Sequence, residues 1–218
     1  MNARLGISPG PARRALDIVA SAIGLVVLAP VLLGIALAVR LTSPGPAVFK
    51  HERVRQGGGS FKLWKFRTMR NDAGGSDLTL ANDPRITKVG DFLRRVRLDE
   101  LPQLVNVLRG DMTLVGPRPE APSLAERYPP EHAVIFRYRP GLTGPGALRL
   151  AQRDDLPTDP DEADRFYFEV ATPERVRLDM AYLTDATLRK TLAFILETIR
   201  GIFRRGAATA IAEAEPGA

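Results

Sequence analysis

The longest stretch of the chain without a charged residue covers residues 18–39 and consists almost entirely of apolar side chains. Its 22 residues would form a straight helix about 33 Å long. Because the hydrocarbon core of a bilayer is about 30 Å thick, the stretch predicts a helix that enters a membrane. A cleavable signal peptide fits poorly, since the stretch is longer than the apolar part of a usual signal.

Two features of this stretch favour a helix that turns back over a helix that crosses. Pro30 lies near its middle, where it removes a backbone hydrogen bond and bends a helix. Basic residues flank both ends, and such flanks prefer the cytoplasmic face: Arg4, Arg13 and Arg14 before it, and Arg40, Lys50, Arg53 and Arg55 after it. Both ends reach one face if the helix enters, bends at Pro30 and returns. A straight span that tolerates Pro30 is the alternative.

Shorter alternating segments follow the apolar stretch. The breaker sequence TSPGP at residues 42–46 ends the helix. Strand-like residues 48–55 and 61–69 enclose three glycines at residues 57–59, and this arrangement predicts a β-hairpin. The polar residues 71–82 predict a surface loop.

Apolar residues at helical spacing dominate the rest of the chain. Between residues 83 and 110 they predict two helices, the second beginning at Pro102 and capped by Gly110, and a strand at residues 112–116 follows. Residues 160–205 are mainly helical in pattern. The last helix carries an apolar stripe beside basic residues, which suits either the membrane interface or packing on the core: Leu192, Ile195, Leu196, Ile199 and Phe203.

Composition narrows the chemistry. The formal net charge of +6 fits nucleic acid, an anionic membrane surface or phosphate-bearing substrates. The chain has no cysteine, which excludes disulfides, zinc–thiolate sites and cysteine nucleophiles. His51 and His132 are far apart in sequence, so a metal would bind to carboxylate oxygens, which suits magnesium or manganese. A nucleic-acid partner is disfavoured, because Trp64 and Phe66 give only a hint of the aromatic side chains that interleave with basic ones on such a surface.

Residues 83–120 are dense in charge and hold the adjacent acids Asp99 and Glu100. Arginine binds phosphate through two parallel hydrogen bonds, and a carboxylate can hold magnesium or attack phosphorus as a nucleophile. Strand alternation would put Lys65 and Arg67 on one face of the hairpin. Spacing alone nevertheless favours the simpler interpretation, in which the two acids form ordinary surface ion pairs with residues 94–97.

Four strings in this order resemble the bacterial sugar transferase family, which comprises monotopic polyprenol-phosphate phosphoglycosyl transferases. They are FKLWKFRTM at residues 61–69, NDPRITKVGDFLRR at 82–95, LDELPQLVNVLRGDMTLVGPRPE at 98–120 and YRPGLTG at 138–144. The resemblance runs from about residue 13 to about residue 205, and the chain looks like the small form that consists of the catalytic domain alone.

The resemblance implies transfer of a sugar 1-phosphate from a UDP-sugar to undecaprenyl phosphate, the first step of O-antigen, capsule, exopolysaccharide or glycoprotein glycan assembly. Asp99 matches the family's nucleophile, which forms a phosphosugar-aspartyl intermediate as UMP leaves, and Glu100 matches the adjacent glutamate. Mg²⁺ assists at Asp99, Glu100 and the diphosphate. Basic motif positions imply binding of phosphate and stabilisation of charge: Lys65, Arg67, Arg85, Arg94 and Arg118.

The family's fold completes the expectation of an α+β protein. It has an N-terminal re-entrant membrane helix in residues 1–41, and a cytoplasmic and interfacial catalytic domain in residues 42–205. That domain contains a short β-hairpin and is mainly helical, with amphipathic interfacial helices. Residues 206–218 are expected to be a disordered tail. Membrane lipids of the cytoplasmic face of the bacterial inner membrane are expected partners, and the sequence leaves a homodimer open.

Two positions depart from the family pattern. Ala29 precedes Pro30 where a serine is common, so the bend lacks a hydroxyl that could satisfy freed backbone groups. Ala147 stands where a glutamine is expected, which leaves the sugar unspecified. An inactive scaffold of a glycan-assembly complex and a nucleic-acid-binding membrane protein are the other function classes, and the intact Asp99–Glu100 pair argues against the scaffold.

Overall fold

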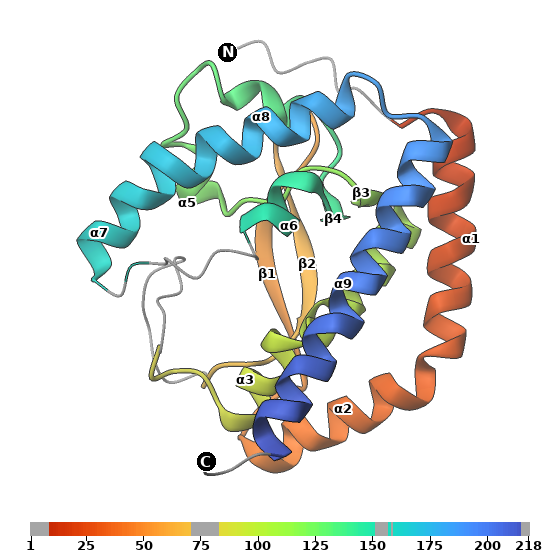
Figure 1. Ribbon diagram of the computed structural model, residues 1–218, viewed down its shortest axis with the longest axis vertical. Coiled ribbons are helices and arrows are strands. Elements are labelled where there is room, and N and C mark those ends of the chain that lie inside the picture. The colour runs from red at the N-terminus through yellow and green to blue at the C-terminus, as the bar shows by residue number, and fades with distance from the viewer. Residues whose placement is uncertain (1–8, 71–82, 151–156, 158, 215–218) are drawn as a thin grey trace.

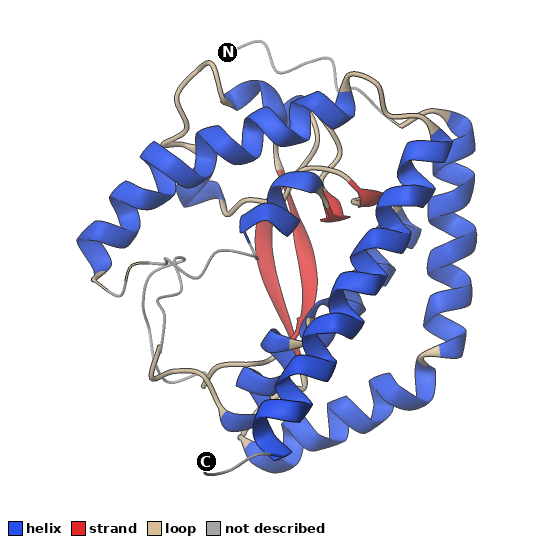
Figure 2. Ribbon diagram, in the orientation of Figure 1, coloured by secondary structure: helices blue, strands red, loops and turns tan. Residues whose placement is uncertain are grey.

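The computed structural model describes residues 9–70, 83–150, 157 and 159–214, with side chains described as far as residue 201. Helices surround a central two-stranded hairpin (Figure 1, Figure 2), so the predicted α+β class is confirmed. Arg4 and the loop expected at residues 71–82 lie outside the described residues. In chain order the elements are α1 (Pro11–Val27), α2 (Ala29–Thr42), β1 (Val48–Val54), β2 (Ser60–Phe66), α3 (Lys88–Arg95), the 3₁₀-helix η1 (Leu98–Gln103), α4 (Leu104–Arg109), β3 (Thr113–Val115), α5 (Pro122–Ala125), the 3₁₀-helix η2 (Ala133–Arg137), β4 (Gly141–Thr143), α6 (Pro145–Leu150), α7 (Pro160–Arg165), the π-helix η3 (Phe166–Ala171), α8 (Thr172–Leu183) and α9 (Leu188–Ala214).

The predicted hairpin is confirmed as the antiparallel pair β1 and β2, in register from Val48 opposite Phe66 to Val54 opposite Ser60. Gly57 and Gly59 in its turn have φ values of 77° and 74°, a backbone region that favours glycine. β2 ends at Phe66, earlier than predicted, and Met69 instead forms an isolated bridge with Ile86.

A second, parallel pair joins β3 to β4. The strand at β3 is the one expected at residues 112–116, whereas β4 was not predicted, because three residues are too short to show an alternating pattern. Gly116 and Gly141 approach each other so closely that a Cβ on Gly141 would lie 2.1 Å from the Gly116 nitrogen. Two glycines therefore bring the segment after β3 against the segment before β4.

The apolar stretch forms two helices rather than one. α1 and α2 meet at Leu28 and are bent by 63°. Leu28 donates its N–H to the Gly24 carbonyl at 2.9 Å, and Pro30 lies in the first turn of α2, where its missing N–H costs no helical bond. The bend thus forms with Ala29 in place of serine. Within the described residues no single helix is long and apolar enough to cross a membrane, whereas the bent pair together is.

The first half of this bent helix is not apolar all round. α1 buries Arg13, Asp17 and Ser21 against the rest of the protein. The opposite side of both helices exposes large apolar side chains: Ile18, Val19, Ile23, Val26, Val27, Val31, Leu33, Leu37 and Leu41. The bent helix therefore has one face for the protein and one apolar face that the described chain leaves uncovered.

Three groups of buried side chains form the core. The first cluster consists of Phe61, Leu63, Leu104, Val107, Met112, Leu114 and Val115. The second cluster consists of Val39, Phe66 and Leu93, and the third of Tyr128, Ile135 and Val176. β2 contributes to both the first and the second cluster, so the hairpin connects them.

The predicted stripe on α9 divides between two environments. Ile195 packs against the first cluster, whereas Leu192, Leu196 and Ile199 are exposed; the side chain of Phe203 lies outside those described. α9 continues to Ala214 and so includes residues 206–214 of the stretch expected to form a disordered tail. Five of these nine residues are alanine, the residue with the highest helix propensity. Residues 215–218 lie outside the described part.

Asp179 on α8 is a buried carboxyl that predicts pH-dependent stability. Its Oδ1 accepts a hydrogen bond from the Gly146 N–H at 2.9 Å, and burial raises its pKa to about 7. Because the unfolded pKa is near 4, folding takes up a proton between those values. The stability from Asp179 is fully present below about pH 4 and is lost as the pH rises through about 7.

We therefore expect the free energy of unfolding to fall from pH 5 to 8, by at most about 1.4 kcal/mol per pH unit. Asp179→Asn keeps an acceptor oxygen but cannot ionise, so its pH dependence should be flatter and its stability at pH 8 higher than that of the original protein. Denaturant unfolding of both proteins between pH 5 and 8 measures this difference. Equal slopes would contradict the assignment.

Candidate active site

Asp99 and Glu100 lie on η1, at a sharp reversal of the chain. α3 ends at Arg95, and Arg97 then adopts φ 56°, the one positive φ of a non-glycine residue in the described part of the chain. Such a conformation is disfavoured by about 1–2 kcal/mol and occurs often at functional sites. The second helix does not begin at Pro102 as predicted. Pro102 lies inside η1 instead, and α4 follows at Leu104.

Lys65 reaches Asp99 from the neighbouring strand. Its Nζ lies 2.6 Å from Asp99 Oδ2, and the Asp99 side chain is only 3% exposed. A buried carboxylate needs such a partner, because transfer of an unpaired charge out of water costs several kcal/mol. The prediction of exposed ion pairs with residues 94–97 is therefore wrong for Asp99, which is buried and pairs with the hairpin instead.

The surroundings shift the two acids in opposite directions. Burial raises the pKa of Asp99, with Lys65 opposing the shift and Glu100 adding to it. Burial acts in the same sense on Glu100, but nearby cations outweigh it and lower the pKa: Lys65, Arg118, Arg97 and Arg94. Active sites use such a separation to give two carboxyl groups different roles.

Three of the five predicted basic residues gather at this pair. Lys65 contacts Asp99 directly. Arg94 on α3 has its pKa lowered by burial, while the charge of Asp99 favours its charged form. Arg118 lies exposed in the GPRP turn, and its charge lowers the pKa of Glu100.

The other two predicted residues are engaged elsewhere. Arg85 forms a two-pronged pair with Asp83, at 2.9 Å from Nε to Oδ1 and 2.6 Å from Nη2 to Oδ2. Arg67 is buried and donates to the Ser43 carbonyl at 2.7 Å, at the end of α2. Lys65 and Arg67 therefore contact different elements, because β2 ends at Phe66 and strand alternation no longer applies beyond it.

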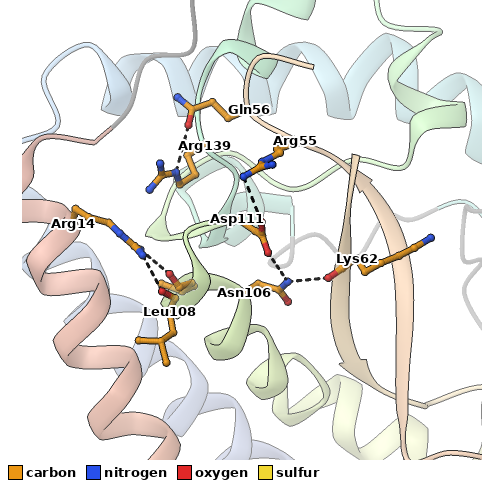
Figure 3. A network of polar contacts seen from close by, with 9 residues as sticks. Arg14, Arg55, Gln56, Lys62, Asn106, Leu108, Asp111 and Arg139 are labelled. Carbon is orange, nitrogen blue, oxygen red and sulfur yellow. Dashed lines mark hydrogen bonds and ion pairs between the residues drawn. The ribbon is translucent and has the colours of Figure 1, made fainter. Parts of the chain in front are cut away.

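Asn106 holds the acid-bearing segment against the hairpin, and the sequence did not identify it. Figure 3 shows its side chain between Lys62 and Asp111. The amide accepts from the Trp64 N–H at 2.9 Å and donates to the Lys62 carbonyl at 2.8 Å. Asn106 thus continues the hydrogen-bonding pattern of β2 on its open edge, and it is completely buried. In the sequence, Asn106 is marked only as a polar residue among the apolar residues of α4, LVNVLR.

A buried network supports the GPRP turn from α8. Glu120, directly after the turn, accepts from Arg175 Nη2 at 2.6 Å and from the Tyr167 hydroxyl at 2.5 Å. Arg175 also contacts the Tyr128 hydroxyl. Burial opposes the shift, but Arg175 lowers the pKa of Glu120, so the pair is charged. These partners lie 47 and 55 positions from Glu120 along the chain, too far for a spacing argument to find them.

Ala147, the second departure from the family pattern, is buried in α6. It directly follows Gly146, the glycine that Asp179 holds. This segment leads from β4, and β4 lies beside the GPRP turn through the contact of Gly141 with Gly116. Ala147 therefore lies in a buried segment that follows the strand beside the GPRP turn.

We expect Arg175→Met to destabilise the protein by about 3–5 kcal/mol, because it leaves Glu120 charged, buried and unpaired. The double variant Glu120→Gln, Arg175→Met removes both charges and should lose less than the single variant. Denaturant unfolding measures both losses. A double variant at least as unstable as Arg175→Met would contradict a dominant electrostatic role.

Comparison with known proteins identifies relatives of most of the chain. Residues 9–205 match the family model described as bacterial sugar transferase. A UDP-glucose:undecaprenyl-phosphate glucose-1-phosphate transferase from Caulobacter vibrioides is 41% identical over 192 residues, which cover 86% of this chain and 68% of the relative. The exopolysaccharide production protein PSS of Rhizobium leguminosarum bv. phaseoli is 40% identical over 205 residues, covering 89% of this chain and 96% of the relative.

Some relatives are much longer than the matched region. A UDP-N-acetylgalactosamine-undecaprenyl-phosphate N-acetylgalactosaminephosphotransferase from Aeromonas hydrophila is 39% identical over 198 residues, which cover 87% of this chain but 43% of the relative. The named sugars differ between these relatives, whereas the shared region includes the acid pair and the GPRP turn of this chain. On the match to nearly its whole length, the chain belongs to the bacterial sugar transferase family.

Proposed function

We propose that this chain transfers a sugar 1-phosphate from a UDP-sugar to undecaprenyl phosphate and so initiates glycan assembly. Relatives of 41% and 39% identity carry names that describe this type of reaction with glucose and with N-acetylgalactosamine. The observation that carries the proposal is the buried Asp99 carboxylate, 2.6 Å from Lys65, next to Glu100 and the charges of Arg94 and Arg118. A carboxylate within a cationic surround suits attack on a phosphate ester.

The reaction proceeds through a covalent intermediate on Asp99. A carboxylate oxygen of Asp99 attacks the phosphorus that carries the sugar, the bond from that phosphorus to the bridging oxygen breaks, and UMP leaves with the electron pair. The phosphorus of the resulting phosphosugar-aspartyl intermediate, an acyl phosphate, is then attacked by a phosphate oxygen of undecaprenyl phosphate. This second displacement releases the Asp99 carboxylate and yields the lipid diphosphate sugar. Two displacements at one phosphorus divide a difficult transfer into two easier steps.

The cations have separate roles in this reaction. Lys65 holds the Asp99 carboxylate in place and favours its charged form in a buried position. Arg94 and Arg118 face the pair from two different segments and bind the phosphate oxygens, whose charge they balance as it redistributes. Arg118 is exposed, so it can meet a soluble nucleotide at the mouth of the site.

The residues at the site fit a magnesium ion. Asp99 and Glu100 offer adjacent carboxylate oxygens, and no group of three or more His, Cys, Asp or Glu residues lies close enough together in the described chain to form an all-protein cage. Mg²⁺ is bound in this manner, by one or two carboxylates together with substrate phosphates and water. When bound, the ion neutralises charge on the diphosphate. Glu100 has the more open side chain, 17% exposed against 3% for Asp99.

The bent helix supports a location at the cytoplasmic face of the bacterial inner membrane. α1 and α2 together have the length and apolar composition to enter a bilayer, and their 63° bend suits a re-entrant path. α9 adds Leu188, Leu192, Leu196 and Ile199 as exposed apolar side chains. A basic amphipathic helix of this kind lies in the interface between lipid headgroups and acyl chains. This location would let a lipid phosphate and a soluble UDP-sugar reach Asp99 together.

Replacement of the nucleophile should abolish turnover. With undecaprenyl phosphate and a panel of UDP-sugars, the original protein should release UMP, and Asp99→Asn should lower the rate by at least about a thousand-fold. A radiolabelled sugar phosphate should remain on the original protein when no acceptor is added, and not on Asp99→Asn. Asp91→Asn, an exposed acid on α3, is the control and should retain activity. Full activity of Asp99→Asn would exclude the aspartyl mechanism. If neither the original protein nor its variants released UMP, the result would favour the inactive scaffold.

Removal of divalent ions tests the magnesium assignment. We expect EDTA to lower UMP release by at least about a hundred-fold and excess Mg²⁺ to restore it, because the ion balances diphosphate charge. The melting temperature without substrate should change little, since the substrate phosphates supply part of the coordination. Unchanged UMP release in EDTA would remove magnesium from the mechanism.

A further inference from the structure

The two halves of the bent helix pack on different parts of the core. Leu16, Ala20 and Leu25 of α1 pack against the first cluster. Leu32 and Ile35 of α2 pack against the second cluster, to which α2 itself contributes Val39. The 63° bend at Leu28 therefore fixes how the two clusters lie relative to each other.

The Lys65–Asp99 pair lies where these two clusters meet. On β2, Lys65 follows Leu63 of the first cluster and precedes Phe66 of the second. On η1, Asp99 follows Leu98, which packs against the second cluster, and Leu104 of the first cluster comes after it. A shift of one cluster against the other would change the 2.6 Å contact between Lys65 and Asp99.

Arg67 connects α2 to the strand that carries Lys65. Its Nη2 donates to the Ser43 carbonyl at 2.7 Å, to the Ser43 hydroxyl at 2.9 Å and to the Val39 carbonyl at 3.3 Å. Ser43 is the C-cap residue of α2, and the Val39 carbonyl also accepts its N–H at 3.3 Å, so Arg67 contacts the C-terminal end of this helix. Arg67 lies two positions after Lys65, so it fixes this end of the bent helix beside the lysine.

Arg14 makes the corresponding connection from α1. Its Nη1 donates to the Val107 carbonyl at 2.6 Å and its Nη2 to the Leu108 carbonyl at 2.9 Å, at the end of α4 (Figure 3). α4 directly continues η1, the element that carries Asp99. Each half of the bent helix is thus bonded through an arginine to a segment adjoining an element of the ion pair: α1 to α4, which follows η1, and α2 to the residue that follows β2.

Arg67 is poorly explained as a residue for stability alone. Its Nε and Nη1 are buried without a hydrogen-bond partner in the described part of the chain. Buried donors without partners destabilise a fold, so an apolar side chain of similar length would be expected at a position selected for packing. Its Nη2 donates to the end of α2, whereas the four cations that lower the pKa of Glu100 are Lys65, Arg118, Arg97 and Arg94.

We propose that Arg67 is a positioning residue that sets the Lys65–Asp99 geometry by fixing the end of α2 to β2, rather than a phosphate ligand. The proposal rests on the proposed function, because its measure is the rate of UMP release. The bent helix then connects the membrane to the ion pair. A change in the position of α1 and α2 in the bilayer would change the distance between Lys65 and Asp99.

The experiment compares kcat and KM of UMP release for full-length variants in the same membrane mimetic. We expect Arg67→Met to lower kcat by about 10- to 100-fold, since a misplacement of about 1 Å can cost that much, with KM for the UDP-sugar within about two-fold of the original. Arg67→Lys keeps a donor for Ser43 and should recover part of kcat. Val39→Ala weakens the same cluster but keeps the hydrogen bonds of Arg67, so as the matched control for stability it should lower kcat much less than Arg67→Met does.

A double variant tests whether Arg67 acts through Lys65. If it does, the double variant Lys65→Met, Arg67→Met should have a kcat within about two-fold of that of Lys65→Met alone, because coupled residues give non-additive losses. Losses that multiply, or an equal fall of kcat in Val39→Ala, would show a general structural role and overturn the proposal. A raised KM with kcat retained would make Arg67 a substrate ligand and overturn it as well. No UMP release by the original protein would instead overturn the proposed function, and the positioning role with it.

Discussion

The contact between Lys65 and Asp99 is the constraint on which the rest of the structure depends. A carboxylate that is 3% exposed is retained only if a cation lies beside it, and here that cation comes from another element. Strand β2 and helix η1 must therefore meet in one register. Asn106 secures that register by bonding both the Trp64 N–H and the Lys62 carbonyl. The ion pair is thus supported by backbone geometry rather than by side-chain packing alone.

The N-terminal helix contributes to this constraint as much as to any membrane contact. Arg13 donates to the Val115 carbonyl, and Asp17 accepts from Thr113 and from the Leu114 N–H. A helix that served only as an anchor would have no reason to bury an arginine and an aspartate. These bonds make α1 part of the folded unit, so forces on the bent helix reach the core directly.

The sequence predicted the family better than the tertiary contacts. The ordered strings around Asp99 and Glu100 identified the family, and the hairpin followed from strand pattern and three glycines. Pro30 correctly indicated a bend, because a missing N–H has a local effect that needs no tertiary information. The partners of Glu120, by contrast, come from Tyr167 and Arg175 on a later pair of helices. Contacts across about fifty residues are set by packing, which single-sequence spacing does not encode.

Because single-sequence spacing does not encode tertiary contacts, it also could not separate the five basic motif residues into those near the acids and those bonded elsewhere. Lys65, Arg94 and Arg118 converge on the acids, while Arg85 binds Asp83 and Arg67 binds the end of α2. A motif records that a residue type is required at a position, and an arginine is equally suited to a phosphate and to the unpaired carbonyls at a helix end. Only the direction of the side chain separates these roles. In Arg67 that direction depends on where β2 ends, and so on Phe66 being the last residue of the strand. The end of a strand can thus decide whether an arginine contacts a helix end, as Arg67 does, or lies near the acids, as Arg94 does.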